Sequence, residues 1–218
     1  MSASGSIRLI VLDFDGVILE SNHAKTEAFR ELFATFPGHA DAMMAYHHAH
    51  VSLSRYGKFR HLVFERLARP GDEAMVMALA ADYEARVRQR IDRCALVPGA
   101  AELLDEFHGR VPLFLASVTP EPELLGILER RGLRRCFDGV FGDPPVPKAE
   151  AVARVLSSTG VAATDAALVG DSPGDLGVAQ ATGVAFIGRD SGIPFPAPAP
   201  PLHRDLFGVA AALRPLIP

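Results

Sequence analysis

Short apolar runs alternate with amphipathic segments along the second half of the chain. The runs predict buried strands at 111–116, 138–141, 166–169 and 184–187, and the segments between them predict helices at 121–131, 148–157 and 175–181. An isolated apolar run at 7–12, which ends at Asp13, predicts one more buried strand. A proline-rich connector at 194–201 leads to a last amphipathic segment, 206–216. Short strands separated by helices are typical of right-handed βαβ units, so the pattern predicts an α/β fold with a parallel sheet.

The segment between the first strand and this alternating part has a different pattern. No convincing strand occurs from about Ser21 to Arg93. Apolar residues recur there at helical spacing, as in Val76, Ala80, Tyr83, Val87 and Ile91. Asp72 is predicted to N-cap the last helix of the block, and Pro98-Gly99 marks the return to alternation. The pattern therefore predicts a Rossmann-like core over 1–16 and 96–218, with an all-helical insert, the cap, over 17–95.

Composition and charge narrow the class of protein. The chain has 218 residues, of which 49% are hydrophobic and 22% charged, as in globular proteins. Its formal net charge of −4 disfavours a nucleic-acid partner, and no apolar run approaches the roughly 20 residues of a membrane span. Two cysteines are typical of a reducing cytosol, and Asp13 comes too early for the apolar core of a signal peptide. We therefore expect a cytoplasmic protein, either a monomer or a homodimer.

Chemically useful side chains follow several of the predicted strands. They are Asp13-Phe14-Asp15-Gly16-Val17 after the first, Ser117-Val118-Thr119 after the second, Lys148 beyond the loop after the third, and Gly170-Asp171-Ser172-Pro173-Gly174-Asp175 after the fourth. In an open parallel sheet, ligands bind at the carboxyl ends of the strands. Carboxylates suit Mg²⁺, and an ammonium group with a hydroxyl can neutralise phosphoryl oxygens. This set can therefore hold a divalent cation and a phosphoryl group together.

The spacing of Asp13 and Asp15 also has a chemical reason. Residues i and i+2 of an extended segment point the same way, so both carboxylates can address one substrate. One of them can act as a nucleophile, while the other protonates the leaving oxygen and then deprotonates water.

In these motifs the chain resembles the haloacid dehalogenase superfamily, in the subclass whose helical cap follows the first strand and which includes phosphoglycolate phosphatases and β-phosphoglucomutases. The matching elements are Asp-x-Asp-Gly-Val at 13–17, Ser117 at the end of an apolar strand, Lys148, and Gly-Asp-x-x-x-Asp at 170–175. The stretch 97–100 resembles the return from the cap. The resemblance covers nearly the whole chain.

The resemblance implies a role for each matched position. Asp13 would form an aspartyl-phosphate, and Asp15 would be the general acid and base. Mg²⁺ would be held by Asp13, Asp15 (through its backbone carbonyl), Asp171 and Asp175, and the phosphoryl group by Ser117 and Lys148. The acid at Asp15 places the chain with phosphatases and phosphomutases, because dehalogenases lack it.

Residues of the predicted cap are candidates for substrate recognition. Arg55 and Lys58 form a basic pair that would suit a substrate with a second anionic group. Lys25 stands about where related mutases have a histidine, which weakens the mutase interpretation, and Thr119 of the core is a further substrate-binding candidate. Three histidines of the same block are interpreted as solvent-facing or loop residues: His47, His48 and His50.

The resulting prediction is a Mg²⁺-dependent phosphatase acting on a small phosphorylated metabolite, such as a sugar phosphate or a phosphoglycolate-like compound. A sugar phosphomutase that uses the same residues is the alternative. A phosphate-accepting signalling domain is a remote alternative, because such domains need no large helical insert. The Gly-x-Ser-x-Gly pattern at 170–174, followed by Asp190 and His203, also matches a serine hydrolase, but that interpretation leaves Asp13, Asp15 and Lys148 without a role.

Overall fold

The computed structural model describes residues 6–218, so residues 1–5 of the predicted core segment lie outside the description. The chain divides into two compact units. The first unit runs to Glu20 and resumes from Ala95 to Pro218, and the second unit, called the helical unit below, is Ser21–Cys94.

The first unit keeps a short segment that the pattern assigned to the cap. Val17, Ile18 and Leu19 are completely buried. Leu19 forms an antiparallel bridge with Leu96, and the Val97 N–H donates to the Ile18 carbonyl at 3.0 Å. Because this backbone pairs with residues 96 and 97 of the first unit, residues 17–20 belong to that unit.

The first unit is built on a parallel sheet. Its strands are β1 (Leu9–Leu12), β2 (Leu113–Ser117), β3 (Gly139–Gly142), β4 (Ala166–Gly170), β5 (Ala185–Arg189) and β6 (Leu202–His203). Over the described residues the strand order is β3-β2-β1-β4-β5-β6, and all neighbours are parallel. The predicted α/β fold is confirmed. Since β1 lies between β2 and β4, the strand order reverses beside it, which is where open α/β sheets bind ligands.

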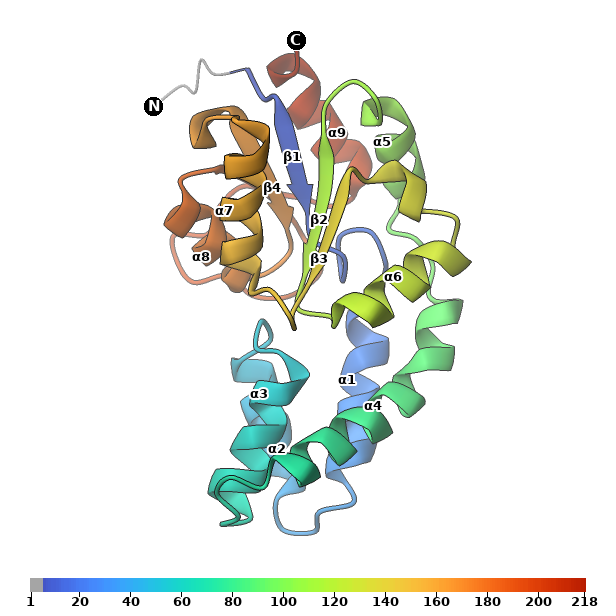
Figure 1. Cartoon of the computed structure of the whole chain (residues 1–218), viewed down its shortest axis with the longest axis vertical. Helices are drawn as coiled ribbons and strands as arrows, with labels where there is room; N and C mark the ends of the chain where they lie inside the picture. The colour runs from blue at the N-terminus through green and yellow to red at the C-terminus, as the bar shows by residue number, and fades with distance from the viewer. Residues whose placement is uncertain (1–5) are drawn as a thin grey trace. The chain divides into compact units, whose positions relative to one another are not determined.

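Helices cover both faces of this sheet (Figure 1). They are α5 (Ala100–Phe107), α6 (Glu121–Arg130), α7 (Lys148–Thr159), α8 (Pro173–Thr182) and α9 (Leu206–Leu213), with short 3₁₀ turns at Arg134–Cys136, Ala163–Asp165 and Arg214–Leu216. Leu9 and Val11 of β1 share a buried cluster with Val152 and Val155 of α7. The intervening Ile10 points to the opposite face. Burial on both faces explains why the central strands read as continuous apolar runs.

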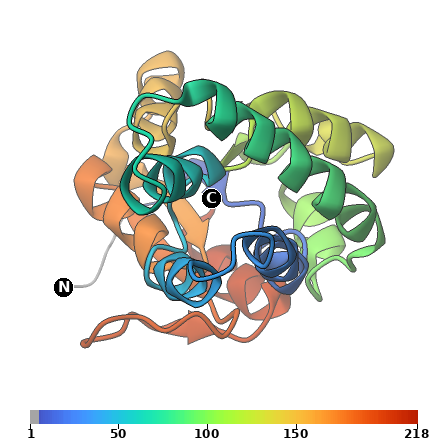
Figure 2. The ribbon, with the colours of Figure 1, turned by 90° about the horizontal axis from the view of Figure 1, so that it is seen from below.

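The helical unit comprises α1 (Asn22–Phe33), α2 (Ala40–Ala49), α3 (Arg55–Arg60), a π-helical segment His61–Arg66 and α4 (Glu73–Arg93). Helix α4 packs against α1 and α3, and Figure 2 shows α1 nearly end-on. The predicted apolar stripe of α4 is buried, and Asp72 caps this helix by accepting from the Met75 N–H at 3.0 Å. The aromatic rings of Phe29, Phe59 and Tyr83 pack together in the interior of the helical unit.

Strand β6 and the π-helical segment are among the elements that the predicted pattern does not contain. Strand β6 has only two residues, Leu202 and His203, too few to show a period, and one short π-helical segment, His61–Arg66, leaves no period of its own in the sequence. In addition, β5 continues to Arg189, beyond the predicted end at residue 187. No helix in the described part of the chain is both long enough and apolar enough to span a membrane.

Candidate active site

The polar side chains predicted at the strand ends come together at the carboxyl edge of the sheet. Asp13 directly follows β1, Ser117 ends β2, and Asp171 directly follows β4. Because β1 pairs with both β2 and β4, these three strand ends are neighbours. The starts of two helices add Lys148, the first residue of α7, and Asp175, in the first turn of α8.

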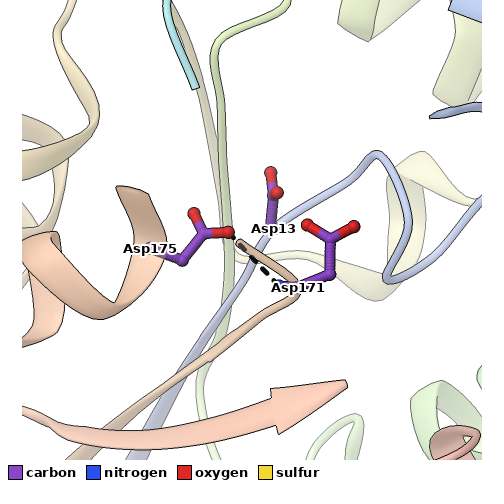
Figure 3. Close-up of side chains that lie close together, drawn as sticks. All are labelled: Asp13, Asp171 and Asp175. Carbon is purple, nitrogen blue, oxygen red and sulfur yellow. Dashed lines mark hydrogen bonds between the residues drawn. The ribbon is translucent and has the colours of Figure 1, made fainter. Parts of the chain in front are cut away.

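Asp13, Asp171 and Asp175 form a buried cluster of carboxylates. One oxygen from each lies within 4.8 Å of the other two, and Figure 3 shows the three side chains projecting to the same side of their backbone segments. Their exposed fractions are 6%, 2% and 2%. Buried carboxylates this close repel one another, and hard oxygen donors are the ligands that Mg²⁺ and Ca²⁺ bind. The donor set therefore fits a divalent cation.

Lys148 connects two members of this cluster. Its Nζ lies 2.8 Å from Asp13 Oδ1 and 2.6 Å from Asp175 Oδ1, and the side chain is buried. Burial would lower the pKa of Lys148, but the charges of Asp13 and Asp175 outweigh burial and raise that pKa above its usual range. Lys148 is therefore a fixed positive charge, and it balances only part of the negative charge around it.

The Asp13 carboxylate is held firmly through one oxygen. Oδ1 accepts the Phe14 N–H at 2.7 Å as well as the Lys148 ammonium, and neither bond uses Oδ2. Burial raises the pKa of Asp13 well above its usual value near 3.8, and Lys148 opposes this effect only in part. The neighbouring carboxylates, Asp175 foremost, raise the pKa further. A divalent cation held by these carboxylates would counter both effects.

Asp15 lies in a different environment from Asp13. The Thr119 hydroxyl donates to Asp15 Oδ2 at 2.9 Å, and the Ser117 hydroxyl approaches the same oxygen at 3.5 Å. The Thr119 N–H in turn donates to Ser117 Oγ at 3.1 Å. The Asp15 side chain is thus bound to hydroxyl groups at the exit of β2, outside the carboxylate cluster. The two aspartates predicted to have separate roles therefore have separate settings.

Asp175 is fixed by a capping box at the start of α8. Its Oδ2 accepts the Ser172 hydroxyl at 2.7 Å and the N–H groups of Asp171 and Ser172 at 3.2 Å each. In return, Ser172 Oγ accepts the Asp175 N–H at 3.3 Å. Ser172 is therefore a helix cap, which argues against its being a serine-hydrolase nucleophile.

Gly170 makes the position of Asp175 possible. A Cβ at residue 170 would lie 2.7 Å from the Asp175 carboxyl carbon and 2.8 Å from its Oδ2, closer than non-bonded atoms approach. The glycine in the predicted Gly-Asp-x-x-x-Asp element is therefore a steric requirement of the site.

The basic residues predicted for substrate binding lie in the helical unit, and two of them are buried there. The Lys58 Nζ lies 5.0 Å from the Phe29 ring centroid and donates to the Val51 carbonyl at 3.3 Å. The Arg55 guanidinium lies 4.7 Å from the centroid of Tyr83. Burial, together with the charge of Lys25, lowers the pKa of Lys58 to about 7. The helical unit thus buries a cation beside an aromatic cluster, and this charge lowers the free energy of unfolding.

The interpretation of His47 as a solvent-facing or loop residue is wrong. His47 is 6% exposed, its ring centroid lies 4.7 Å from that of Phe29, and its Nε2 lies 3.1 Å from Thr26 Oγ1. Burial, helped by the positive charge of Lys58, lowers the pKa of His47 to about 3. His48 and His50 are exposed, as expected. His47 is buried because α2 turns this face toward α1.

One further buried cation of the first unit was not singled out from the sequence. Arg189 ends β5 and donates to the backbone carbonyl of Gly16 at 3.1 Å. A basic residue two positions beyond the predicted strand 184–187 was the available signal, but its partner, Gly16, lies 173 positions away in the sequence.

Comparison with known proteins agrees with this geometry. Residues 10–189 match the haloacid dehalogenase-like hydrolase family. A relative from Dickeya dadantii, described as "Probable phosphatase IndB", is 27% identical over 194 residues, which are 85% of this chain and 82% of the relative. The chain belongs to the haloacid dehalogenase-like hydrolase family and is an enzyme; the family and this relative together support phosphatase chemistry.

Solved structures share the fold at low sequence identity. A predicted phosphoglycolate phosphatase from Haemophilus somnus superposes with a TM-score of 0.73 at 16% identity, covering 97% of this chain and 99% of that one. CbbY from Rhodobacter sphaeroides, in complex with phosphate, gives a TM-score of 0.72 at 20% identity, covering 91% of this chain and 94% of CbbY. These likenesses confirm the fold.

Proposed function

We propose that the protein is a Mg²⁺-dependent phosphatase that hydrolyses a small phosphomonoester through an aspartyl-phosphate. The observation that carries this proposal is the Lys148 ammonium between Asp13 Oδ1 and Asp175 Oδ1, within a buried carboxylate cluster. This arrangement combines a fixed nucleophile with positive charge for the phosphoryl oxygens.

The two aspartates divide the reaction between them. Asp13 Oδ2 attacks phosphorus, a new P–O bond forms, and the bond to the ester oxygen breaks. Asp15 gives its proton to that leaving oxygen, so that an alcohol departs. Asp15 then takes a proton from water, whose oxygen attacks the phosphoryl group, releasing phosphate and restoring the Asp13 carboxylate. Lys148 holds Asp13 in place and balances charge on the phosphoryl oxygens, with Ser117 as a hydrogen-bond donor.

The carboxylates of Asp13, Asp171 and Asp175, with the backbone carbonyl of Asp15, are the groups that would hold Mg²⁺. When bound, the ion would supply positive charge that favours transfer of an anionic group. The all-oxygen donor set fits hard divalent cations, and Mg²⁺ is proposed because it is commonly bound by a few carboxylates together with substrate phosphate oxygens.

The substrate would be a small phosphorylated metabolite such as a sugar phosphate or a phosphoglycolate-like compound. Lys25, Arg55 and Lys58 are proposed to recognise a second anionic group on the substrate, and Thr119 is proposed as a further substrate-binding residue. Support comes from the basic pair Arg55 and Lys58 in the sequence, because charge-assisted hydrogen bonds to an anionic group are strong. The low cysteine content supports a cytoplasmic location.

Phosphate release from an aryl phosphate and a panel of small phosphometabolites, with Mg²⁺ or with EDTA, tests the proposal. Wild type should release phosphate only with the metal, and Asp13→Asn should abolish release. Asp41→Asn, at an exposed carboxylate of α2, is the matched control and should keep full activity. Release that survives in Asp13→Asn would refute the nucleophile. Isomerisation of a sugar phosphate that needs a bisphosphate activator would instead identify a phosphomutase.

A further inference from the structure

Arg189 is buried at the end of β5, although the reaction proposed above gives it no role. Its exposed fraction is 7%. Nη1 donates to the Gly16 carbonyl at 3.1 Å and to Glu20 Oε2 at 3.3 Å, and Nη2 donates to Glu20 Oε1. One side chain from a distant strand thus holds both ends of the segment 16–20.

The first end of this segment adjoins the proposed acid. Gly16 has a φ of 72°, a left-handed conformation that favours glycine, and its N–H donates to the Leu19 carbonyl at 2.8 Å. The Leu19 N–H donates to the Phe14 carbonyl at 3.1 Å, which closes a tight turn. Because Gly16 directly follows Asp15, a bond to the Gly16 carbonyl restricts the backbone from which Asp15 reaches Thr119.

The second end of the segment is the last residue before the helical unit. The Glu20 N–H donates to the Ala95 carbonyl at 3.0 Å, beside the antiparallel bridge between Leu19 and Leu96. The outgoing and returning parts of the chain are therefore hydrogen-bonded to each other here. Through the Glu20 carboxylate, Arg189 ties this hydrogen-bonded pair of segments to β5.

We propose that Arg189 is a positioning residue for Asp15: by binding the Gly16 carbonyl and the Glu20 carboxylate together, it holds the turn that carries the acid and base of the reaction. The inference rests on the proposed phosphatase function. It adds a residue on β5 to a site built otherwise from the ends of β1, β2 and β4 and the starts of α7 and α8.

Two features favour this role over a purely structural one. The Arg189–Glu20 pair contributes little net stability, because burial desolvates the guanidinium while the Glu20 carboxylate is exposed and its attraction is screened by solvent. In addition, Arg189 Nε is buried and has no hydrogen-bond partner among the described residues, a cost that an apolar side chain would avoid. The planar guanidinium places Nη1 on the Gly16 carbonyl and both terminal nitrogens on the Glu20 carboxylate, a two-nitrogen fork that the single nitrogen of a lysine lacks.

Leaving-group dependence tests the proposal, because only a poor leaving group needs a well-placed acid. In Arg189→Met, kcat/KM, which reports the steps up to departure of the leaving group, should fall about tenfold or more for an alkyl phosphate such as glycerol 3-phosphate and about twofold or less for 4-nitrophenyl phosphate. Arg189→Lys, which keeps the charge without the fork, should show an intermediate loss. Arg214→Met is the matched control, since Arg214 forms a two-bond pair with Glu106 (2.7 and 2.8 Å) in the same unit, at an exposed position.

Equal losses on both substrates, or equal losses in Arg214→Met, would overturn the positioning role, and full activity in Arg189→Lys would overturn the role of the Gly16 bond. Amide hydrogen exchange supplies a second measurement that does not depend on activity. Arg189→Met should speed exchange at Gly16, Leu19 and Glu20 without global unfolding, and unchanged exchange would refute the inference. A wild type that releases no phosphate would refute the proposed function instead, and the exchange result would still decide whether Arg189 holds the turn.

Discussion

Lys58→Met should make the protein more stable at neutral pH, and the gain should vanish at alkaline pH. Lys58 is 3% exposed, and burial lowers its pKa from the usual 10.5 to about 7. Methionine has a similar length and packs well against aromatic rings, so it keeps the volume and removes the charge. The helical unit would no longer have to bury an ammonium group between Phe29 and the Val51 carbonyl.

The magnitude follows from proton linkage. Between pH 7 and 10.5 the unfolded chain keeps the Lys58 proton and the folded chain has released it, so stability rises with pH in this window. At about 1.4 kcal/mol per pKa unit, the charge costs wild type about 4 kcal/mol at pH 7 and less than about 1 kcal/mol at pH 10. Methionine loses the hydrogen bond and the cation–π contact, about 1 kcal/mol each, so the net gain at pH 7 is about 2 kcal/mol.

Urea unfolding of wild type and Lys58→Met at pH 7 and pH 10 measures this difference. Arg66→Met, at an exposed basic residue of the same unit, is the control and should change stability by less than about 0.5 kcal/mol at either pH. If Lys58→Met had the same effect at both pH values, Lys58 would not be a buried cation with a lowered pKa, and the reasoning would fail. If the proposed substrate role is correct, the stabilised variant should also show a raised KM for a substrate with two anionic groups.

Three further predictions concern the first unit. Asp15→Asn should lower kcat for an alkyl phosphate by about 10²–10⁴-fold while the Tm changes little. Steady-state kinetics measures the first effect and a thermal melt the second, and near-normal kcat would exclude Asp15 as the acid. Adding Mg²⁺ in the millimolar range should raise the Tm of wild type but not that of Asp171→Asn, because an ion that binds only the folded state stabilises it; an equal rise in both would place the ion elsewhere. Gly170→Ala should displace Asp175 and abolish most of the activity, since the new Cβ would fall on its side chain; a fully active variant would show that the site tolerates a shift of Asp175.

Much of the site follows from the position of residues relative to the strands. Apolar runs located the strands, and in a parallel sheet their carboxyl ends share one edge, so Asp13, Ser117 and Asp171 were expected on the same edge; the strand order makes them neighbours. The structure adds which residues touch. It joins Asp13 to Asp175 through Lys148, and it gives Asp15 a hydroxyl partner 104 positions away, in Thr119.

Periodicity was least informative about polar residues in the helical unit. It showed which stripe of α4 is apolar, but it could not show that His47 and Lys58 are also buried. A helix buries whatever its neighbours cover, and here the neighbours are the aromatic rings of other helices. The pKa values near 3 and near 7 arise from that packing.

The sequence alone determined the α/β alternation, the long helical insertion and the order of acidic, hydroxyl and basic residues at the strand ends, because these depend on local periodicity and on chain direction. Only the tertiary structure decided the charge state of each group and the contacts of Arg189. The pKa values depend on desolvation and on nearby charges, and the contacts of Arg189 depend on residues that the strand order brings from distant parts of the chain. Local spacing in the sequence encodes neither the pKa values nor these contacts.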